Sequence, residues 1–537
     1  MKKITILFCT AAMLFFSAAN AQLFQNLIGK TDFDEKGYSV TRSVDGSYLI
    51  GGSFVSAFGG NVPTTPALVH LKSNGSVDWV RQVNGNKLFD VRYAEALKSP
   101  TGTADGYIAL AYFPDSSYTV IRLTDAGTVV WARKLKLNKS QTIRLPKIKP
   151  VYSSPTSAPS FFLTFDFADF TVVETVIMKL DANGNTIWQR VIANPATNTG
   201  YAFNDIKVTN DSGCVLTGSS QKRITLCKLN AAGKLVLAKS YRFFTNSSGG
   251  NSIDQMSNGG YAITGFESGT DNNVTCKIAP NGQAIWAFRY KPQNNNKIAG
   301  QGVISDASGN IIVAGGVDAD LGVQHAYIMK LNSFGVVTFA KEYASEIDIY
   351  DFKLTSQGYC AAGTKLPGSI SGKAGIYVLQ TNINGNIAAG CIPATVSYTR
   401  ESAEFDSVLN LPFVFQKPDV KNTPVTVTTS LITTLEDRCS TSAPEAFIAE
   451  TQTAGKLSAY PVNGNNDIRV EYKTTVESNN HYEVKLYNLN GEIFATASLR
   501  ANQPVVLRAD NLQQGMYIVA LSNKDILIQR EKIMIGK

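Results

Sequence analysis

The sequence predicts an all-β protein in which a seven-bladed β-propeller is followed by a small C-terminal β-sandwich. Three observations lead to this fold class. A motif of eleven residues, in which a glycine turn joins two short strands, recurs at a period of about 50 residues up to residue 391. All four tryptophans of the chain occupy one position of this motif. The last stretch, of about 80 residues, lacks the motif and shows short alternating strands between turn residues.

The length, the composition and the net charge of the chain fit a folded, exported protein. The chain has 537 residues, which is too long for one compact core, so more than one folding unit is expected. Hydrophobic residues make up 44% and charged residues 17%, which argues against disorder. The net charge of +8 is mild for this length and is not gathered into basic runs, so no nucleic-acid partner is expected.

Residues 1–21 have the pattern of a secretory signal peptide. Lys2 and Lys3 form its charged end, residues 4–16 form a short apolar stretch, and residues 19–21 (Ala-Asn-Ala) are a small-x-small cleavage site. Later apolar runs are shorter than the ~18 residues that span a bilayer, so no transmembrane segment is expected after cleavage. We therefore expect the Sec translocon to export the chain.

The repeat is anchored on a turn glycine that recurs in seven units, at Gly75, Gly127, Gly184, Gly233, Gly282, Gly335 and Gly385. Four residues after each glycine stand Trp79, Trp131, Trp188, Leu237, Trp286, Phe339 and Ala389. An apolar strand precedes each turn, at 45–53, 105–111, 160–165, 212–219, 259–266, 309–316 and 357–364. Short β-rich runs at this period are typical of four-stranded blades, so residues 22–391 are assigned to the propeller.

The hairpin register follows if Asn-Gly is a two-residue turn. The residue five before the glycine then faces the residue four after it, so Lys179 lies opposite Trp188. The same slot holds His70, Arg122, Lys179, Lys228, Lys277, Lys330 and Gln380. The neighbouring slot places a leucine or isoleucine opposite Val130, Ile187, Val236 and Ile285, on an aliphatic face. The cations could form an anion-binding ring, but cross-strand stacking of each cation on its facing ring is the favoured interpretation.

A ring of blades must close, and the start of the mature chain offers the closing strand. The segment 24–29 (FQNLIG) resembles 79–85 (WVRQVNG), with Phe24 in the tryptophan position. We expect this first strand to complete the last blade. The segment 181–185 (DANGN) mimics the start of a calcium loop but lacks the later glutamate, so a hairpin turn is expected there and no metal site.

Residues 392–439 break the period and are rich in Val, Thr and Pro. We expect extended strands packed beside the propeller, joined by a disulfide between Cys391 and Cys439, because disulfides are allowed in an exported protein. The other cysteines of the mature chain lie in apolar strands and are expected to be small core residues. Residues 440–455 are small, polar and unpatterned, and read as a linker.

Candidate functions divide into binding and catalysis. The three histidines, His70, His325 and His481, do not gather with acids at metal spacing, and no nucleophile motif or separate carboxylate pair is evident. A non-catalytic surface propeller that binds a glycan or a protein is therefore favoured, with no cofactor. Its ligand would meet the connections that vary between units, at 53–66, 138–159, 291–300 and 317–325. A secreted hydrolase or lyase using the propeller funnel is the alternative, and a cell-envelope scaffold is a third.

The tryptophan hairpin resembles the blade of pyrroloquinoline-quinone-type propellers over about eleven residues of each unit. This resemblance implies the fold only. The acidic metal ligands and the central arginine of the quinone enzymes cannot be placed in this sequence.

Residues 456–537 carry a more specific resemblance. The strands 457–472, 481–499 and 510–525 resemble the type A C-terminal sorting domain of the type IX (Por) secretion system of Bacteroidetes. The matching residues are Tyr460, Pro461, Tyr487, Leu489, Gly491, Leu512, Gly515 and Tyr517. One departure is Pro-Val-Asn-Gly where the family usually has Pro-Asn-Pro. The resemblance implies passage through the type IX outer-membrane translocon, followed by release or anchoring at the outer cell surface.

Overall fold

The structure is a computed structural model. It describes residues 23–437 and 455–535, apart from the segments 30–33, 56–63, 85–89, 114–116, 138–141, 155, 169–172, 194–200, 270–271, 294–296, 320–322, 346, 366–373, 388–393, 396–397, 403–406, 411–413, 417–419, 432–435, 463–466, 475–480, 489–492, 509–511, 513 and 524–525. The predicted signal peptide, residues 1–21, and both cysteines of the expected disulfide, Cys391 and Cys439, lie outside the described residues. Within the described residues, a search for helices able to span a bilayer finds none.

Every regular element of the described chain is a β-strand, from β1 to β42, which confirms the all-β prediction. The chain divides into two compact units with the boundary at residue 441. We call the first the ring unit and the second the C-terminal unit.

The ring unit consists of seven five-stranded antiparallel sheets. The first contains β2 (Asp34–Arg42), β3 (Tyr48–Val55), β4 (Thr64–Leu71), β5 (Val77–Asn84) and β34 (Thr428–Leu431). The second contains β6 (Asp90–Lys98), β7 (Ala104–Phe113), β8 (Ser117–Leu123), β9 (Val129–Leu137) and β33 (Val420–Pro424). The third contains β10 (Thr142–Val151), β11 (Ser160–Ala168), β12 (Val173–Leu180), β13 (Thr186–Ala193) and β32 (Val414–Gln416).

The remaining four sheets repeat this order. The fourth contains β14 (Ala202–Val208), β15 (Cys214–Ser220), β16 (Arg223–Leu229), β17 (Leu235–Arg242) and β31 (Ser407–Asn410). The fifth contains β18 (Ser248–Gln255), β19 (Tyr261–Glu267), β20 (Asn272–Ile278), β21 (Ala284–Pro292) and β30 (Tyr398–Ser402). The sixth contains β22 (Lys297–Ser305), β23 (Ile311–Ala319), β24 (Val323–Leu331), β25 (Val337–Ser345) and β29 (Ala394–Thr395). The seventh contains β26 (Ile347–Thr355), β27 (Gly358–Lys365), β28 (Gly375–Gln380), β1 (Phe24–Gly29) and β35 (Glu436–Asp437).

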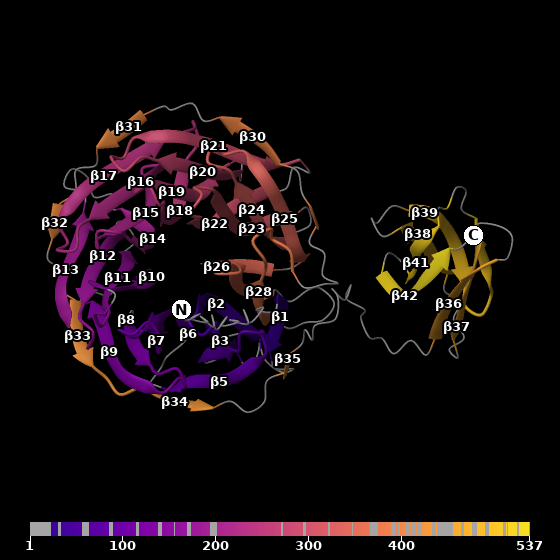
Figure 1. Cartoon of the computed structure of the whole chain (residues 1–537), viewed down its shortest axis with the longest axis horizontal. Helices are drawn as coiled ribbons and strands as arrows, with labels where there is room; N and C mark the ends of the chain where they lie inside the picture. Colours follow the sequence, from indigo (N-terminus) through magenta and orange to yellow (C-terminus); the bar gives the residue numbers. More distant parts are fainter. Residues whose placement is uncertain are drawn as a thin grey trace, which may run out of the picture. The chain divides into compact units, whose positions relative to one another are not determined.

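The seven sheets follow one another around a ring, with the first strand of each sheet on the inside (Figure 1). Each first strand contacts the first strand of the next sheet, and β26 of the seventh sheet contacts β2 of the first. Each pair of neighbouring sheets also shares a buried apolar cluster. In the cluster between the first two sheets, Leu49 and Leu68 join Tyr107 and Ile121. Because both faces of each sheet are covered in this way, the strands read as nearly continuous apolar runs.

The ring closes through residues that are far apart in sequence. Strand β1 pairs antiparallel with β28, and Phe24 lies opposite Gln380. Phe24 is therefore in the register position that tryptophan occupies in other sheets. The pairing confirms the inference that the first strand of the mature chain completes the last repeat.

After β28 the chain runs back around the ring in the opposite direction, as residues 394–437, which we call the belt. Its strands β29 to β35 add, in turn, to the sixth, fifth, fourth, third, second, first and seventh sheets. Each pairs antiparallel with the outermost strand of its sheet, and the labelled belt strands lie on the outside of the ring (Figure 1). A bare outer strand would offer unpaired N–H and C=O groups to other chains, so the belt protects seven edges.

The turn at each repeated glycine differs from the predicted two-residue turn. In the first sheet the Gly75 amide donates to the Lys72 carbonyl and the Lys72 amide donates to the Ser76 carbonyl. Gly75 has φ of +86°, so this is a three-residue loop with a left-handed glycine. A register shift then follows between His70 and Leu71, which restores the predicted pairing of His70 with Trp79.

The same compensation operates along the ring. Lys179 faces Trp188, and five further predicted slot pairs are confirmed, with Leu237 and Phe339 in the tryptophan position of two of them. In the seventh unit Ala389 lies outside the described residues, and Phe24 faces Gln380. The predicted aliphatic face is wrong, because Leu123 faces Val129 and not Val130. The bulge turns the four predicted partners outward, and they are at least half exposed: Val130, Ile187, Val236 and Ile285.

The repeated glycines and aromatic residues meet between neighbouring sheets. A Cβ atom on Gly127 would lie 2.6 Å from Trp79 of the preceding sheet. The equivalent close approaches are Phe24 to Gly75, Trp131 to Gly184, Trp188 to Gly233, Leu237 to Gly282, Phe288 to Gly335 and Phe339 to Gly385. In the fifth sheet Trp286 lies beside this contact and donates from Nε1 to the Ser333 carbonyl. Seven such contacts go once around the ring and give a physical reason for the repeat.

The C-terminal unit contains two antiparallel sheets. One has the order β36 (Gly455–Pro461), β37 (Ile468–Thr474) and β40 (Val505–Leu507). The other has the order β39 (Ile493–Arg500), β38 (His481–Asn488), β41 (Gly515–Asn523) and β42 (Ile526–Ile535). Residues of both sheets form one buried cluster, which includes Ile468, Val484 and Val519.

Candidate functional site: a polar cavity on the inner strands

The first strand of each sheet in the ring unit carries a β-bulge or register irregularity near its middle. The shifts fall between Gly37 and Ser39, Val91 and Tyr93, Arg144 and Lys147, Phe203 and Asp205, Gly250 and Ser252, Gly300 and Gly302, and Ile349 and Asp351. A bulge re-aims the side chains beside it and leaves one residue without a ladder partner. Equivalent irregularities in all seven inner strands therefore concentrate re-aimed side chains in the middle of the ring.

Carboxylates beside the bulges fasten neighbouring sheets together. Asp205 accepts hydrogen bonds from the amide of Ile206 at 2.9 Å and from the amide of Ile253, in the next sheet, at 3.1 Å. Asp351 repeats the arrangement, since it accepts from its neighbour Phe352 at 3.0 Å and from Val40 of the first sheet at 3.1 Å. These carboxylates satisfy backbone donors that the bulges release.

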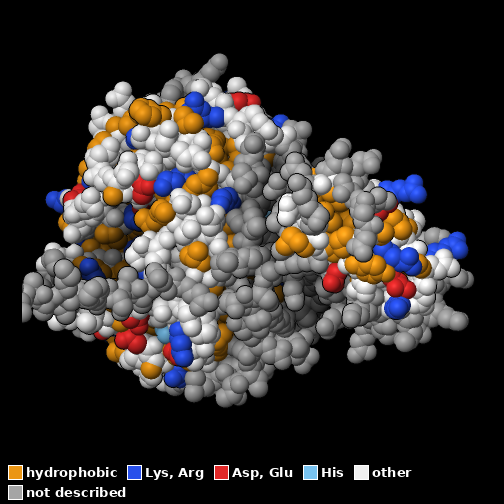
Figure 2. All heavy atoms as spheres, turned by 45° about the vertical axis from the view of Figure 1, so that its right-hand side comes forward, with side chains coloured by type: hydrophobic (Ala, Val, Ile, Leu, Met, Phe, Trp, Pro, Cys, Tyr) orange, Lys and Arg blue, Asp and Glu red, His pale blue; other side chains and the backbone are white. Residues whose placement is uncertain are grey.

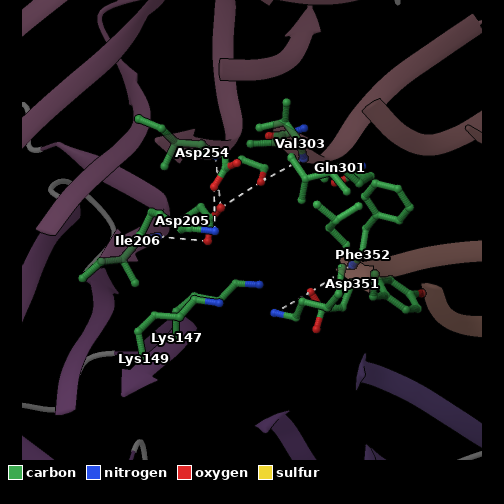
Figure 3. Close-up of a pocket in the computed structure, with 18 of the residues that line it drawn as sticks. Lys147, Lys149, Asp205, Ile206, Asp254, Gln301, Val303, Asp351 and Phe352 are labelled. Carbon is green, nitrogen blue, oxygen red and sulfur yellow. Dashed lines mark hydrogen bonds and ion pairs between the residues drawn. The ribbon is translucent and has the colours of Figure 1, made fainter. Parts of the chain in front are cut away.

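Six of the seven inner strands line a cavity of about 210 Å³ (Figure 3). The lining is predominantly polar: Tyr93, Lys147, Lys149, Asp205, Ile206, Lys207, Asn251, Ser252, Ile253, Asp254, Gln301, Gly302, Val303, Ile304, Ser305, Tyr350, Asp351, Phe352, Lys353 and Leu354. Lys147 and Lys149 extend from β10 toward the side that carries Asp351 (Figure 3). The unpaired bulge residues Asn251, Gln301 and Tyr350 contribute two amides and a phenol to this lining.

One wall of the cavity is a cluster of ammonium groups around a phenol and a carboxylate. Lys353 Nζ lies 2.9 Å from Glu95 Oε1 and 3.0 Å from the Tyr93 hydroxyl. Lys149 contacts the same two groups from the other side. The Tyr93 hydroxyl itself donates to Glu95 at 2.8 Å. Lys147 completes the wall, with Nζ 4.5 Å from the centre of the Tyr93 ring.

Burial and charge set the protonation of this wall. Burial alone would raise the pKa of Glu95, but the ammonium groups of Lys149 and Lys353 outweigh it and hold that pKa far below its ordinary value. Burial lowers the pKa of Lys149 to about 8, with attraction to Glu95 opposing the shift and the charge of Lys353 adding to it. Asp351 and Glu95 raise the pKa of Lys353 above its ordinary value despite burial. At neutral pH the wall therefore carries ammonium groups and one ionised carboxylate.

The acids on the adjoining strands β14 and β18 are more fully engaged. Asp254 accepts hydrogen bonds from the amide and the hydroxyl of Ser305, both at 2.7 Å, and its other oxygen lies 2.6 Å from Lys207 Nζ. Asp205 also accepts from the Ser252 hydroxyl at 2.8 Å. Among the described residues, no group of three or more His, Cys, Asp or Glu side chains has the geometry to hold a metal ion.

The sequence-predicted residues of the repeat lie away from this cavity. Trp79, Trp131, Trp188 and Trp286, with the turn glycines Gly75, Gly127, Gly184 and Gly282, belong to the hairpins of the third and fourth strands. The cations of the facing slot lie in the third strands and mostly pair there with nearby acids. Arg122 lies 2.9 Å from Asp105, Lys228 lies 2.8 Å from Asp211, and Lys330 lies 3.2 Å from Asp306.

The predicted stacking of these cations on their facing rings is therefore largely wrong. Lys179 lies 5.2 Å from the centre of the Phe162 ring and donates to the Ala231 carbonyl of the next sheet. His70 does stack on Trp79, with ring centres 4.8 Å apart. Since most of these charges are engaged inside the hairpins, the alternative of an anion-binding ring at this position has no support.

The residues that resemble a sorting motif are spread over the C-terminal unit. Tyr460 and Pro461 end β36 and are exposed, whereas Leu512 and Tyr517 are buried in its core. Tyr487 lies in β38 and Gly515 begins β41. Leu489 and Gly491 lie outside the described residues. The predicted ligand connections 53–66, 138–159, 291–300 and 317–325 are described in larger part, and 138–159 was wrongly taken for a loop, because residues 142–151 form strand β10. That strand carries Lys147 and Lys149 into the lining of the cavity.

Apart from Lys147 and Lys149, which lie in the candidate connection 138–159, sequence reasoning missed the cavity because its residues do not repeat. Each inner strand supplies different side chains, as in KIK at 147–149, NDIK at 204–207 and DFK at 351–353. The available signal was charged residues inside short strands that precede the glycine-bounded strand of each unit. A period search discards this signal, since it retains what the units share.

Comparisons with known proteins address the C-terminal unit. Residues 458–536 match the family described as a secretion system C-terminal sorting domain, which confirms the resemblance seen in the sequence. The chain is thus a substrate of the type IX secretion system, and the domain indicates secretion and attachment at the cell surface. No match is found among curated proteins.

Solved structures similar to the chain include two proteins described as of unknown function. One is from Bacteroides caccae, with 14% identity, a TM-score of 0.32, and coverage of 52% of this chain and 90% of that one. The other is from Dyadobacter fermentans, with 10% identity, a TM-score of 0.38, and coverage of 67% and 99%. A Synechocystis apocarotenoid oxygenase mutant has 9% identity, a TM-score of 0.31, and coverage of 74% and 96%. These values are too low to support an inference about this chain.

Proposed function

We propose that the ring unit is a seven-bladed β-propeller that binds a glycan in its central cavity at the cell surface. Seven sheets in ring order, seven shared apolar clusters and the closing pair β1–β28 support this architecture. Export through the type IX system, implied by the sorting domain, would place the cavity outside the cell. The C-terminal unit then serves transport, and the ring unit carries the binding function.

The polar lining of the cavity is the observation that carries the glycan proposal. Gln301 offers an amide, which donates and accepts hydrogen bonds as sugar hydroxyls require, whereas the Asn251 amide already donates to the Gly300 carbonyl at 2.9 Å. Tyr350, which is 39% exposed, offers an aromatic ring for the apolar face of a sugar. A volume of about 210 Å³ suits one or two sugar units, so we expect the end of a glycan to enter.

Binding is favoured over hydrolysis by the state of the carboxylates. A glycoside hydrolase needs one carboxyl group that can deliver a proton and a second that acts as base or nucleophile. Asp205 and Asp351 instead accept backbone amides on both oxygens, and Asp254 is engaged by Ser305 and Lys207. Their hydrogen bonds hold the sheets together, which fits a structural role.

The face of the ring unit shown in Figure 2 gives no stronger evidence for a different binding site. Hydrophobic side chains of the ring unit form small separate groups on the face shown in Figure 2, among charged and uncharged polar ones. Large continuous apolar patches mark protein-docking surfaces. Their absence from the described part of this face supports a ligand held in the cavity.

Calorimetric titration of the purified mature chain with a panel of oligosaccharides tests the proposal. At least one should bind, and Gln301→Ala should weaken that binding by about five-fold, the value of one hydrogen bond. Gln283→Ala, which changes an exposed glutamine in an outer hairpin, is the matched control and should leave affinity unchanged. Equal affinity in the Gln301 variant, or no binding across the panel, would overturn the proposal.

A further inference from the structure

We infer that the cavity selects an acidic glycan, whose sugar carboxylate binds the wall formed by Lys147, Lys149 and Lys353. The inference rests on the proposed glycan-binding function and adds the chemical class of the ligand. Its basis is the arrangement of three ammonium groups around the single phenol ring of Tyr93.

The three ammonium groups converge from two inner strands. Their Nζ atoms lie 4.5 Å, 4.9 Å and 5.1 Å from the centre of the Tyr93 ring for Lys147, Lys149 and Lys353. Lys147 and Lys149 come from β10, whereas Lys353 comes from β26 on another sheet. All three line the cavity. Besides burial, the charge of Lys353 lowers the pKa of Lys149, so these like charges repel one another and an anion placed among them is stabilised.

The carboxylates nearby only partly neutralise this wall. Glu95 is shared by Lys149 and Lys353, and Asp351 lies 3.5 Å from Lys353. Among the described residues, no carboxylate lies within ion-pair distance of Lys147. Asp205 adds a further negative charge that acts on Lys149. Ion pairs thus engage Lys149 and Lys353, and Lys147 is the ammonium group of this wall that enters none among the described residues.

The wall also has hydrogen-bond donors to spare. An ammonium group has three N–H donors. Lys149 and Lys353 each use two of theirs, on Glu95 and on the Tyr93 hydroxyl. The Tyr93 hydroxyl donates its own hydrogen bond to Glu95. A sugar carboxylate, which is a charged acceptor, can bind the donors that remain at this wall.

The rest of the lining favours a sugar acid over a bare ion. Asn251, Gln301 and Tyr350 stand in the same cavity and can bind hydroxyl groups, which inorganic anions do not have. The acids of the adjoining strands, Asp205 and Asp254, are occupied by amides, two hydroxyls and Lys207. A carboxylated sugar can thus meet the ammonium wall at one end and the uncharged donors along its body.

Calorimetry of the intact mature protein at pH 7 should use three probes: trigalacturonate, the neutral trisaccharide galactotriose, and inorganic phosphate. The inference expects trigalacturonate to bind at least ten-fold more tightly than galactotriose, and phosphate to bind weakly. Lys147→Gln should reduce affinity for trigalacturonate by about ten-fold or more, since it removes one charge-assisted contact, and should leave galactotriose unaffected. Lys421→Gln, an exposed lysine of the belt, is the matched control and should change neither.

The outcomes separate the two proposals. Equal binding of both trisaccharides would overturn the acidic-ligand inference and leave glycan binding standing. Binding of phosphate alone, or of none of the probes, would overturn the inference for uronate sugars, and the oligosaccharide panel above then decides the glycan proposal independently. Unchanged trigalacturonate affinity in the Lys147 variant would also overturn it. Because Lys147 is only partly buried and glutamine keeps a polar side chain there, its replacement should not prevent folding, which circular dichroism verifies.

Discussion

The contact between Trp79 and Gly127 predicts that Gly127→Ala destabilises the ring unit by more than an ordinary glycine-to-alanine change. Gly127 has φ of +73°, where a Cβ atom costs about 1–2 kcal/mol. That Cβ would also lie 2.6 Å from Trp79 and 2.7 Å from Arg81. Crowding of this kind costs roughly 1–3 kcal/mol, so the two effects together should remove about 2–5 kcal/mol.

Gly102 provides a matched control for the backbone contribution. Its φ is +81°, yet a Cβ atom there would meet nothing within 4 Å. Gly102→Ala should therefore cost only the conformational part, about 1–2 kcal/mol. The difference between the two variants measures the contact with the neighbouring sheet.

Urea unfolding followed by tryptophan fluorescence gives the two free energies. A cycle with Trp79→Ala adds a second check, because removing the indole should bring the cost of Gly127→Ala closer to that of Gly102→Ala, with the contact to Arg81 still present. Equal losses in the two single variants would refute the reasoning. So would a Gly127 cost that stays the same after Trp79 is removed.

Three further predictions concern closure, pH and the belt. Phe24→Ala should lower the unfolding free energy by about 3–5 kcal/mol, because the Phe24 ring is 1% exposed where β1 closes the last sheet. In the same urea titration the control Phe334→Ala, at a site 74% exposed, should change the unfolding free energy by less than about 0.5 kcal/mol. Burial lowers the pKa of His70, and Asp78 partly offsets this shift, so the unfolded chain binds more protons than the folded one. Thermal stability should therefore fall as pH drops below about 6.5. His70→Gln should flatten this pH dependence, and an unaltered profile in the variant would contradict the prediction. Ending the chain after residue 391 removes the belt and exposes seven sheet edges, so the shortened ring unit should self-associate, as measured by light scattering. A monodisperse shortened chain would show that these edges do not need the belt.

The features that could be predicted from the sequence are those that the repeats share. The pairing of Lys179 with Trp188 could be predicted because the glycine fixes the turn and side chains alternate along strands. The outward position of Ile187 could not be predicted. The three-residue turn and the register shift after Lys179 cancel at Trp188, but they leave Ile187, one residue earlier, without a partner across the hairpin. The closing strand was predictable because Phe24 stands in a segment that resembles the fourth strand of other repeats.

The belt and the cavity depend on information that a local pattern does not hold. Residues 394–437 form strands of two to five residues, each paired with a partner that can lie hundreds of positions away. Such short strands have no alternation of their own to specify a register. In the cavity, Lys149 and Lys353 meet at Glu95 only because the ring brings the second, third and seventh sheets together. The sorting residues were accessible because the family motif is itself local.

The most direct test of the account is the destination of the chain in its own cells. Mass spectrometry of periplasmic, outer-membrane and medium fractions should compare the full-length chain with one that lacks residues 456–537. The account predicts that the ring unit of the full-length chain reaches the cell surface or medium, and that the truncated chain accumulates in the periplasm. Equal surface delivery of both chains would contradict it and would make the C-terminal unit a working module in its own right.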